Sequence, residues 1–106
     1  MSPVQRSLAW LKEHGYDPVR KVEVWNSYAK IRQDLWGFDI LAVLSDQITF
    51  IQVTDGAHLA EHIAKLFAMA TTYKLKKTGA RLIIHSWSKL GPRGKRKTWQ
   101  LKEVAI

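Results

Sequence analysis

Two polar side chains, Asp39 and Gln52, stand in segments that are otherwise strongly apolar. Residues 38–55 read FDILAVLSDQITFIQVTD, with one apolar run on each side of a turn at residues 45–47. Asp39 opens the first run, and Gln52 lies in the middle of the second. A charge or an amide in a buried strand costs free energy unless it is paired or coordinates something. We therefore expect this pair of side chains to have a partner.

The hydrophobic periodicity around these residues predicts an α/β fold. Alternation with period two indicates strands, and apolar spacing of three to four indicates helices. The predicted order is α-β-β-β-α-β-β, in which the first three strands form an antiparallel meander and the second helix makes a right-handed crossover to a parallel fourth strand. The result is a mixed sheet with helices packed on it. The predicted elements are helices at residues 3–14 and 57–77, strands at 19–25, 38–44, 48–54, 81–87 and 98–104, and a loop at 26–37.

The composition bounds the class of protein. A chain of 106 residues with 46% hydrophobic and 25% charged residues is typical of one globular domain, which we assign to residues 1–106. Cysteine is absent, which excludes disulfides and thiolate metal sites and agrees with a reducing compartment. The longest purely apolar run, residues 40–44, is far too short to cross a bilayer, and the N-terminus has no signal-peptide core. We expect an intracellular, cytoplasmic protein without membrane contact.

The positive charge of the chain favours nucleic acid as its partner. The formal net charge is +8 and the isoelectric point is about 10.0, so the summed field attracts phosphate backbones. Basic residues cluster in KLGPRGKRK at 89–97, and the segment at 26–33 carries Tyr28, Lys30 and Arg32 between two predicted strands. Solvated loops in a basic protein are the alternative interpretation. The candidate DNA contacts are Lys30, Arg32, Arg93, Lys95, Arg96 and Lys97, with Trp36 as a candidate for base stacking.

The element order and several motifs resemble the PD-(D/E)XK nuclease superfamily, and within it the small phage and archaeal-type Holliday junction resolvases. The resemblance spans nearly the whole chain and is carried by VEVWN at 22–26, IRQDLWGF at 31–38, GFDILA at 37–42 and FIQVT at 50–54. It implies a restriction-endonuclease-like fold. In that superfamily the second strand supplies an aspartate, which Asp39 matches. The third strand supplies an acidic residue or glutamine, an apolar residue and a lysine, and Gln52, Val53 and Thr54 stand at those places.

Thr54 departs from this pattern, because the superfamily usually has its catalytic lysine there. In some members the lysine has moved to the helix that follows the third strand, where Lys65 borders the apolar face. A solvated surface lysine is the alternative interpretation of Lys65. Archaeal resolvases also use a glutamate on the first helix. The matching region here offers Gln5, so Glu23 on the first strand is the better acidic candidate.

The implied chemistry is hydrolysis of a phosphodiester with the help of Mg²⁺ or Mn²⁺. The ion activates a water and stabilises charge on the phosphate and on the leaving oxygen. Magnesium prefers oxygen ligands and typically takes one or two carboxylates. The expected ligands are Asp39, the amide oxygen of Gln52, the carbonyl of Val53, and Glu23. A glutamine in place of a carboxylate removes negative charge, so we expect weaker metal binding.

A second motif, HLAEH at residues 58–62, matches the H-x-x-E-H pattern of inverted zincins. Zinc protease chemistry needs a third ligand further along the chain, and the only later acidic residue is Glu103. We therefore expect His58 and His62 to flank the helix or to contact phosphate.

The sequence thus predicts a metal-dependent endonuclease that cleaves DNA, with branched DNA as the expected substrate. A homodimer is expected, since a symmetric junction suits a two-fold assembly. Two alternatives stay open. One is a nuclease fold that binds nucleic acid without cleaving it, for which Gln52 and Thr54 are the signs. The other is an interaction module in which Asp39 is only a hydrogen-bonding residue at a strand end.

Overall fold

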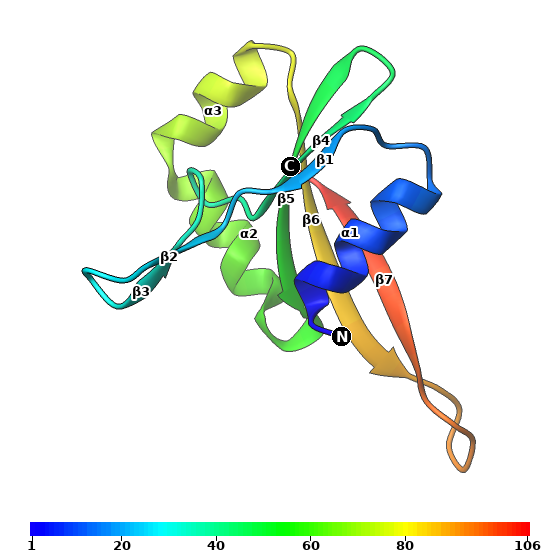
Figure 1. The fold of residues 1–106 in the computed structure, drawn as a ribbon. Coiled ribbons are helices and arrows are strands. Elements are labelled where there is room, and N and C mark those ends of the chain that lie inside the picture. Colours follow the sequence, from blue (N-terminus) through cyan, green and yellow to red (C-terminus); the bar gives the residue numbers. More distant parts are fainter.

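The chain forms one α/β domain built on a five-stranded mixed sheet, which the computed structural model describes for residues 1–106 (Figure 1). The strand order is β1-β4-β5-β6-β7. These strands are β1 (Val19–Lys21), β4 (Ile40–Leu44), β5 (Gln47–Asp55), β6 (Arg81–Leu90) and β7 (Thr98–Ala105). β5 and β6 are parallel, and the other neighbouring pairs are antiparallel. The predicted meander and parallel crossover are therefore confirmed.

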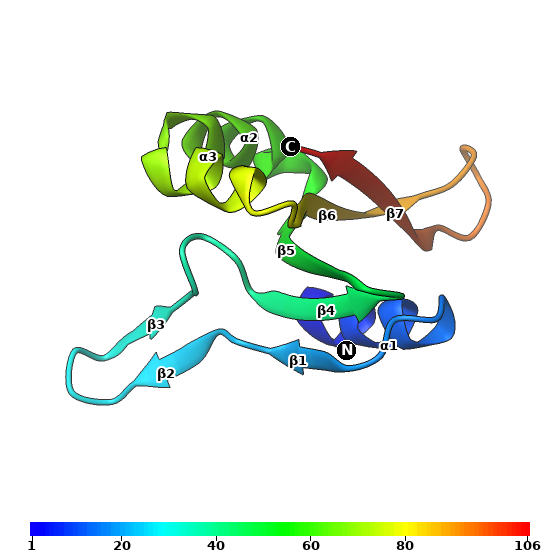
Figure 2. The same ribbon diagram turned by 90° about the horizontal axis from the view of Figure 1, so that it is seen from above.

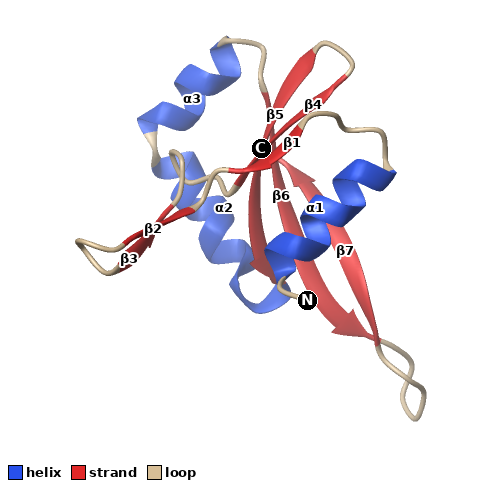
Figure 3. Cartoon of the chain, viewed as in Figure 1, coloured by secondary structure: helices blue, strands red, loops and turns tan.

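Helices cover both faces of the sheet (Figures 2 and 3). The helix α1 (Pro3–Glu13) packs on one face, where Leu11, Tyr16, Ile40, Ala42 and Ile51 form a buried cluster. The other face carries α2 (Leu59–Ala68) and α3 (Ala70–Lys77), above a cluster of Phe38, Phe50, Leu66, Leu82 and Ile84. None of the helices combines the length and the apolar character needed to cross a bilayer. Neighbouring residues of β5 thus supply both cores, because successive side chains of a strand point to opposite faces.

The predicted loop at residues 26–37 is wrong, because the chain forms a second, two-stranded sheet there. The predicted strand at 19–25 divides into β1 and β2 (Val24–Asn26), and β2 pairs with β3 (Ile31–Gln33) as an antiparallel hairpin. The hairpin projects from the body of the domain (Figures 1 and 2). Its apolar side chains are exposed, so they lack the one-sided burial on which the strand prediction was based.

The predicted single helix at 57–77 is also interrupted. A short 3₁₀ turn, η1 (Gly56–His58), precedes α2, and Met69 separates α2 from α3 with an extended backbone (φ −91°, ψ 126°). Met69 packs against the core cluster beneath α2. Neither glycine nor proline marks this position, and only the weakly helix-forming Thr71 and Thr72 lie next to it. The break therefore depends on packing rather than on a local signal.

A chain of hydrogen bonds, buried except at Glu103, fixes α1 to the sheet. Trp87 Nε1 donates to Ser7 Oγ at 2.8 Å, and Ser7 Oγ lies 2.9 Å from His85 Nδ1. The opposite ring nitrogen, His85 Nε2, lies 3.2 Å from Glu103 Oε2 on β7. Burial of the imidazole lowers the pKa of His85 although Glu103 opposes the shift, so the ring is neutral at pH 7. The indole of Trp87, the hydroxyl of Ser7 and both ring nitrogens of His85 therefore all have hydrogen-bond partners.

Candidate functional site

Asp39 lies at the point where β4 parts from β5. Its main-chain N–H donates to the carbonyl of Ile51 at 2.8 Å, and its own carbonyl accepts from Val22 N at 2.8 Å. On the N-terminal side the chain turns away through residues 35–38, where Trp36 and Gly37 both have positive φ (54° and 89°). A Cβ at residue 37 would lie 3.0 Å from Leu66 Cδ2, so glycine allows this close approach.

The carboxylate of Asp39 accepts a hydrogen bond from β5 at the point where β4 ends. Val53 N donates to Asp39 Oδ2 at 2.8 Å, in place of the ladder bond that a continued β4 would have made. In a strand the N–H and the C=O of one residue point in the same direction. The Val53 carbonyl therefore points toward the same open edge as the Asp39 carboxylate.

Gln52 and Asp39 are the residues that follow the last β4–β5 pair, Ile40–Ile51, so their side chains are neighbours at this edge. Gln52 Nε2 lies 3.5 Å from Asp39 Oδ2. Both side chains are nearly inaccessible, with exposed fractions of 4% for Gln52 and 7% for Asp39. Gln52 Oε1 is buried without any donor, and Asp39 Oδ1 receives no hydrogen bond from the protein. Each of the two neighbouring side chains thus has one acceptor oxygen without a donor, and Gln52 turns its amide nitrogen toward Asp39.

The surroundings of Asp39 change its acidity. Burial raises the pKa of Asp39 from 3.8 to about 6, and the Val53 amide opposes this shift. The charges of Glu23 and Asp34 raise the pKa further, and that of Lys65 lowers it. The carboxylate is still ionised at pH 7, but at a cost in free energy that a bound cation would remove.

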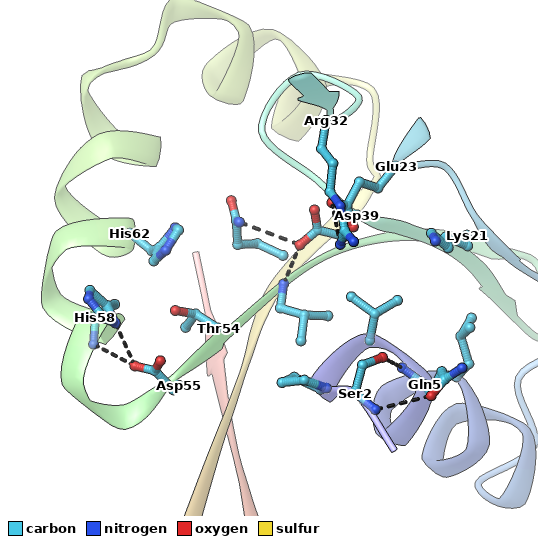
Figure 4. Close-up of a pocket in the computed structure, with 15 residues that line it drawn as sticks. Ser2, Gln5, Lys21, Glu23, Arg32, Asp39, Thr54, Asp55, His58 and His62 are labelled. Carbon is cyan, nitrogen blue, oxygen red and sulfur yellow. Dashed lines mark hydrogen bonds and ion pairs between the residues drawn. The ribbon is translucent and has the colours of Figure 1, made fainter. Parts of the chain in front are cut away.

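Asp39 and Gln52 line a cleft of about 690 Å³ (Figure 4). The N-terminal half of α1 forms one wall, the end of β5 and the start of α2 form another, and residues from β1 and β3 complete the rim. Only three of its 15 lining residues are hydrophobic, so the cleft suits a polar ligand. The polar and charged lining residues are Ser2, Gln5, Lys21, Glu23, Arg32, Asp39, Gln52, Thr54, Asp55, His58 and His62.

Several of the predicted site residues meet in this cleft. Val53 lines it, and Thr54 lies two residues beyond Gln52 on the same face of β5. Glu23 and Arg32 also line it, and Arg32 Nη1 lies 3.7 Å from Glu23 Oε1. The structure assigns Gln5 another use, since it forms a capping box with Ser2 at the start of α1.

Lys65 lies outside the cleft lining. It is exposed on α2 and borders a separate shallow hollow with Glu61 and His62. His62 lines both spaces, so Lys65 is one helical turn from the cleft wall. Its charge acts weakly on Asp39, opposing the rise in that residue's pKa that burial causes.

The predicted DNA contacts are dispersed around the domain. Lys30 is exposed at the turn between β2 and β3, and only Arg32 of this group reaches the cleft. The segment between β6 and β7 is fully exposed and projects beyond the end of the sheet at which β5 also ends (Figure 1). It holds Arg93, Lys95, Arg96 and Lys97. Trp36 is half exposed and lies 6.2 Å, centroid to centroid, from Phe50.

Asp55 is a site residue that the sequence analysis did not propose. It caps η1 by accepting from His58 N, and its Oδ1 lies 2.8 Å from His58 Nδ1. This contact raises the pKa of His58 and lowers that of Asp55. An aspartate that directly follows a strand and precedes a helix is a typical N-cap, and this signal could have identified it.

The two histidines of HLAEH both line the cleft, and Nδ1 of His62 is buried without a partner. Glu61 of the same motif does not line it. No group of three or more His, Cys, Asp or Glu side chains is arranged to hold a metal ion. The zinc site of an inverted zincin is therefore not formed.

Comparison of the chain with protein-family models, with curated proteins and with solved structures finds no match.

Proposed function

We propose that the protein is a divalent-metal-dependent DNA endonuclease with a restriction-endonuclease-like fold. Its substrate would be branched DNA such as a Holliday junction, cut by hydrolysis of a phosphodiester. The observation that carries the proposal is the pair of acceptor oxygens, Asp39 Oδ1 and Gln52 Oε1, which lie in the cleft region without a donor. Gln52 Oε1 is buried, and a buried acceptor normally has a hydrogen-bond donor or a cation as partner.

The residue types suit a hard cation, with one carboxylate rather than a cluster of three or more His, Cys, Asp or Glu side chains. The carboxylate of Asp39, the amide oxygen of Gln52 and the carbonyl of Val53 would hold Mg²⁺ or Mn²⁺, and all three are oxygen ligands. When bound, the ion would supply positive charge to the phosphate and lower the pKa of water. Glu23 would join this set from the rim, where its Oε1 lies 3.7 Å from Arg32 Nη1. One carboxylate with neutral partners holds the ion less tightly than two carboxylates would.

The chain's own groups have distinct tasks in this proposal. Val53 N and Gln52 Nε2 hold the Asp39 carboxylate in one orientation. Lys21, Arg32 and His58, whose pKa the neighbouring Asp55 raises, line the cleft and would attract the phosphate backbone. Lys65 would act on the site through its charge, in the role that Thr54 leaves vacant.

The net charge of +8 and the basic segment between β6 and β7 support DNA as the substrate. Lys30 and this segment would contact the backbone at a distance from the cleft, which suits a large polymer. A homodimer would place two clefts on a two-fold symmetric junction.

A second function is favoured by a specific observation. Thr54 occupies the place of the superfamily's lysine, and Lys65 does not line the cleft. A protein with this arrangement could bind nucleic acid without cutting it, using the same cleft and the same basic segments.

One experiment separates the two functions. A labelled four-way junction and a linear duplex of equal length are incubated with Mg²⁺, with Mn²⁺ or with EDTA. We expect cleavage of the junction in either metal and none in EDTA, with Asp39→Asn as the inactive control. Binding of the junction without cleavage in both metals would instead support the binding function.

A further inference from the structure

The β2–β3 hairpin presents two different faces. Side chains that are opposite each other in an antiparallel pair lie on the same face, and successive residues alternate. Trp25 pairs with Arg32, and these two form one face together with Glu23, whose carboxylate lies 3.7 Å from Arg32. Val24 and Ile31 belong to the opposite face. Trp25 therefore shares a face with two residues that line the cleft.

This face continues the cleft outward. Figure 4 shows Arg32 and Glu23 directed toward Asp39 at the rim. Trp25 is the next residue of this face beyond Glu23, and 60% of it is exposed. A chain that leaves the cleft past Arg32 would meet the ring of Trp25.

The tip of the hairpin is ordered by its own hydrogen bonds. Asn26 Oδ1 accepts from Tyr28 N and from Ala29 N, both at 3.0 Å, and Lys30 has a positive φ of 54°. Tyr28 is 99% exposed, so the turn holds an aromatic ring in solvent. Cations outnumber carboxylates between residues 20 and 34, which favours an anionic partner.

Exposed aromatic rings combined with positive charge suit a single nucleic-acid strand. Bases stack on aromatic side chains regardless of sequence, and cations follow the phosphates. A fully paired duplex hides the faces of its bases, so only unpaired nucleotides can use Trp25 and Tyr28.

We propose that the β2–β3 hairpin guides an unpaired DNA strand out of the cleft. Bases stack on Trp25 and Tyr28, and phosphates contact Lys30 and Arg32. This rests on the proposed function for the identity of the polymer, and it narrows the substrate to DNA that has unpaired nucleotides beside a branch.

The test compares two labelled DNAs in EDTA, a duplex with a single-stranded flap and a fully paired duplex of the same length. Trp25→Ala should weaken binding of the flap about tenfold, the scale for loss of one stacked base. It should change binding of the paired duplex less than about twofold, because no base is free to stack. Trp25→Phe should retain most of the affinity for the flap.

Val24→Ala is the matched control, because Val24 is 59% exposed and lies on the opposite face of the same strand. It should leave flap binding unchanged. A flap that contains 2-aminopurine gives a direct signal, since stacking on Trp25 quenches its fluorescence. The quenching should persist in Val24→Ala and disappear in Trp25→Ala. Circular dichroism checks that each variant is folded.

Three results would overturn the proposal. The first is equal weakening of flap and duplex by Trp25→Ala, and the second is an equal effect of Val24→Ala. The third is a dimer, seen by sedimentation, that both variants dissociate, since the hairpin would then be an interface between copies of this chain.

The outcome is distinguishable from that of the proposed function. Stacking on Trp25 without cleavage in any metal would leave the hairpin's role standing and remove the nuclease. Cleavage at the parent rate together with unchanged flap affinity in Trp25→Ala would remove only the hairpin's role.

Discussion

Two groups of polar side chains in the interior differ in how completely their hydrogen bonds are formed. The chain Trp87–Ser7–His85–Glu103 is closed: indole, hydroxyl and both imidazole nitrogens have partners. The pair of Asp39 and Gln52 is open, because one oxygen of each has no donor. A closed network fixes α1 on the sheet, whereas an open one is costly until something binds. Under the proposed function, the cation would bind at the open pair.

The largest expected effect is the loss of cleavage in Asp39→Asn. The variant removes the only carboxylate of the open pair, so the rate should fall at least a hundredfold, the scale for losing one positioned electrostatic group. Binding of the junction should persist or tighten, since negative charge disappears from the cleft. Asp46→Asn, in the exposed turn between β4 and β5, is the control. Cleavage of the junction by Asp39→Asn at the parent rate would refute the site.

The second prediction concerns Lys65, the proposed substitute for the lysine that is absent at residue 54. If Lys65 serves in place of the strand lysine, Lys65→Ala should lower the cleavage rate about a hundredfold without a comparable loss of DNA affinity. Adding Thr54→Lys should restore part of the activity, because it returns an ammonium to β5. Lys74→Ala on α3 is the matched surface control. An unchanged rate in Lys65→Ala would exclude Lys65 from the chemistry.

The third prediction is that Asp39→Asn stabilises the folded protein. The pKa of Asp39 is raised from 3.8 to about 6, so the folded state holds this proton more tightly than the unfolded state. The ionised carboxylate therefore destabilises the fold increasingly as pH rises from about 4 to 6. Above pH 7 the variant should gain roughly 2–3 kcal/mol in the free energy of unfolding. At pH 3.5 the two proteins should unfold alike in urea, and a gain that persists there would contradict the cause.

Loss of a polar group from the closed hydrogen-bond chain should destabilise the folded protein, whereas Asp39→Asn should stabilise it. Ser7→Ala leaves Trp87 Nε1 and His85 Nδ1 buried without partners, which should cost about 1–3 kcal/mol. Thr49→Val is the control, since Thr49 Oγ1 is buried without a partner and its loss should be nearly neutral. Cleavage by folded Ser7→Ala should stay within about twofold of the parent rate. A larger kinetic effect would connect the closed chain to the site.

The smallest expected effect is a fall in the free energy of unfolding as the pH drops below 6.5. The folded-state pKa of His85 lies below 6.5, so below pH 6.5 the unfolded state takes up a proton that the folded state does not. Stability should fall by up to about 1.4 kcal/mol per pH unit in that range, until the folded-state pKa is reached. Asp39 has the opposite slope between pH 4 and 6, so the measurement is made in Asp39→Asn. The slope should vanish when His85→Gln is added.

The sequence alone determined much of the main sheet. The alternation and apolar runs of residues 38–54 and 81–104 placed β4 to β7, because one-sided or two-sided burial leaves a periodic pattern. The proximity of Asp39 and Gln52 also followed from the sequence. A short turn between two strands fixes which residues are opposite each other.

The exposed hairpin escaped this reasoning. Val24 and Trp25 fell within the predicted strand at 19–25, but Ile31 projects into solvent, so its segment shows no pattern of one-sided burial and was predicted as a loop. The break at Met69 escaped for a similar reason, since it follows from the packing of that side chain on the core.

Only the tertiary structure decided what surrounds the open pair. Asp55, His58 and His62 reach the cleft because β5 ends beside the start of α2, and Ser2 reaches it because Ser7 and His85 hold α1 in place. Lys65 lies outside the cleft lining for the same reason. The way α2 packs on the sheet directs Lys65 to a separate hollow, which it borders with Glu61 and His62. Short-range periodicity sets which face of an element a residue occupies. The meeting of faces from distant elements depends on the packing of the whole core.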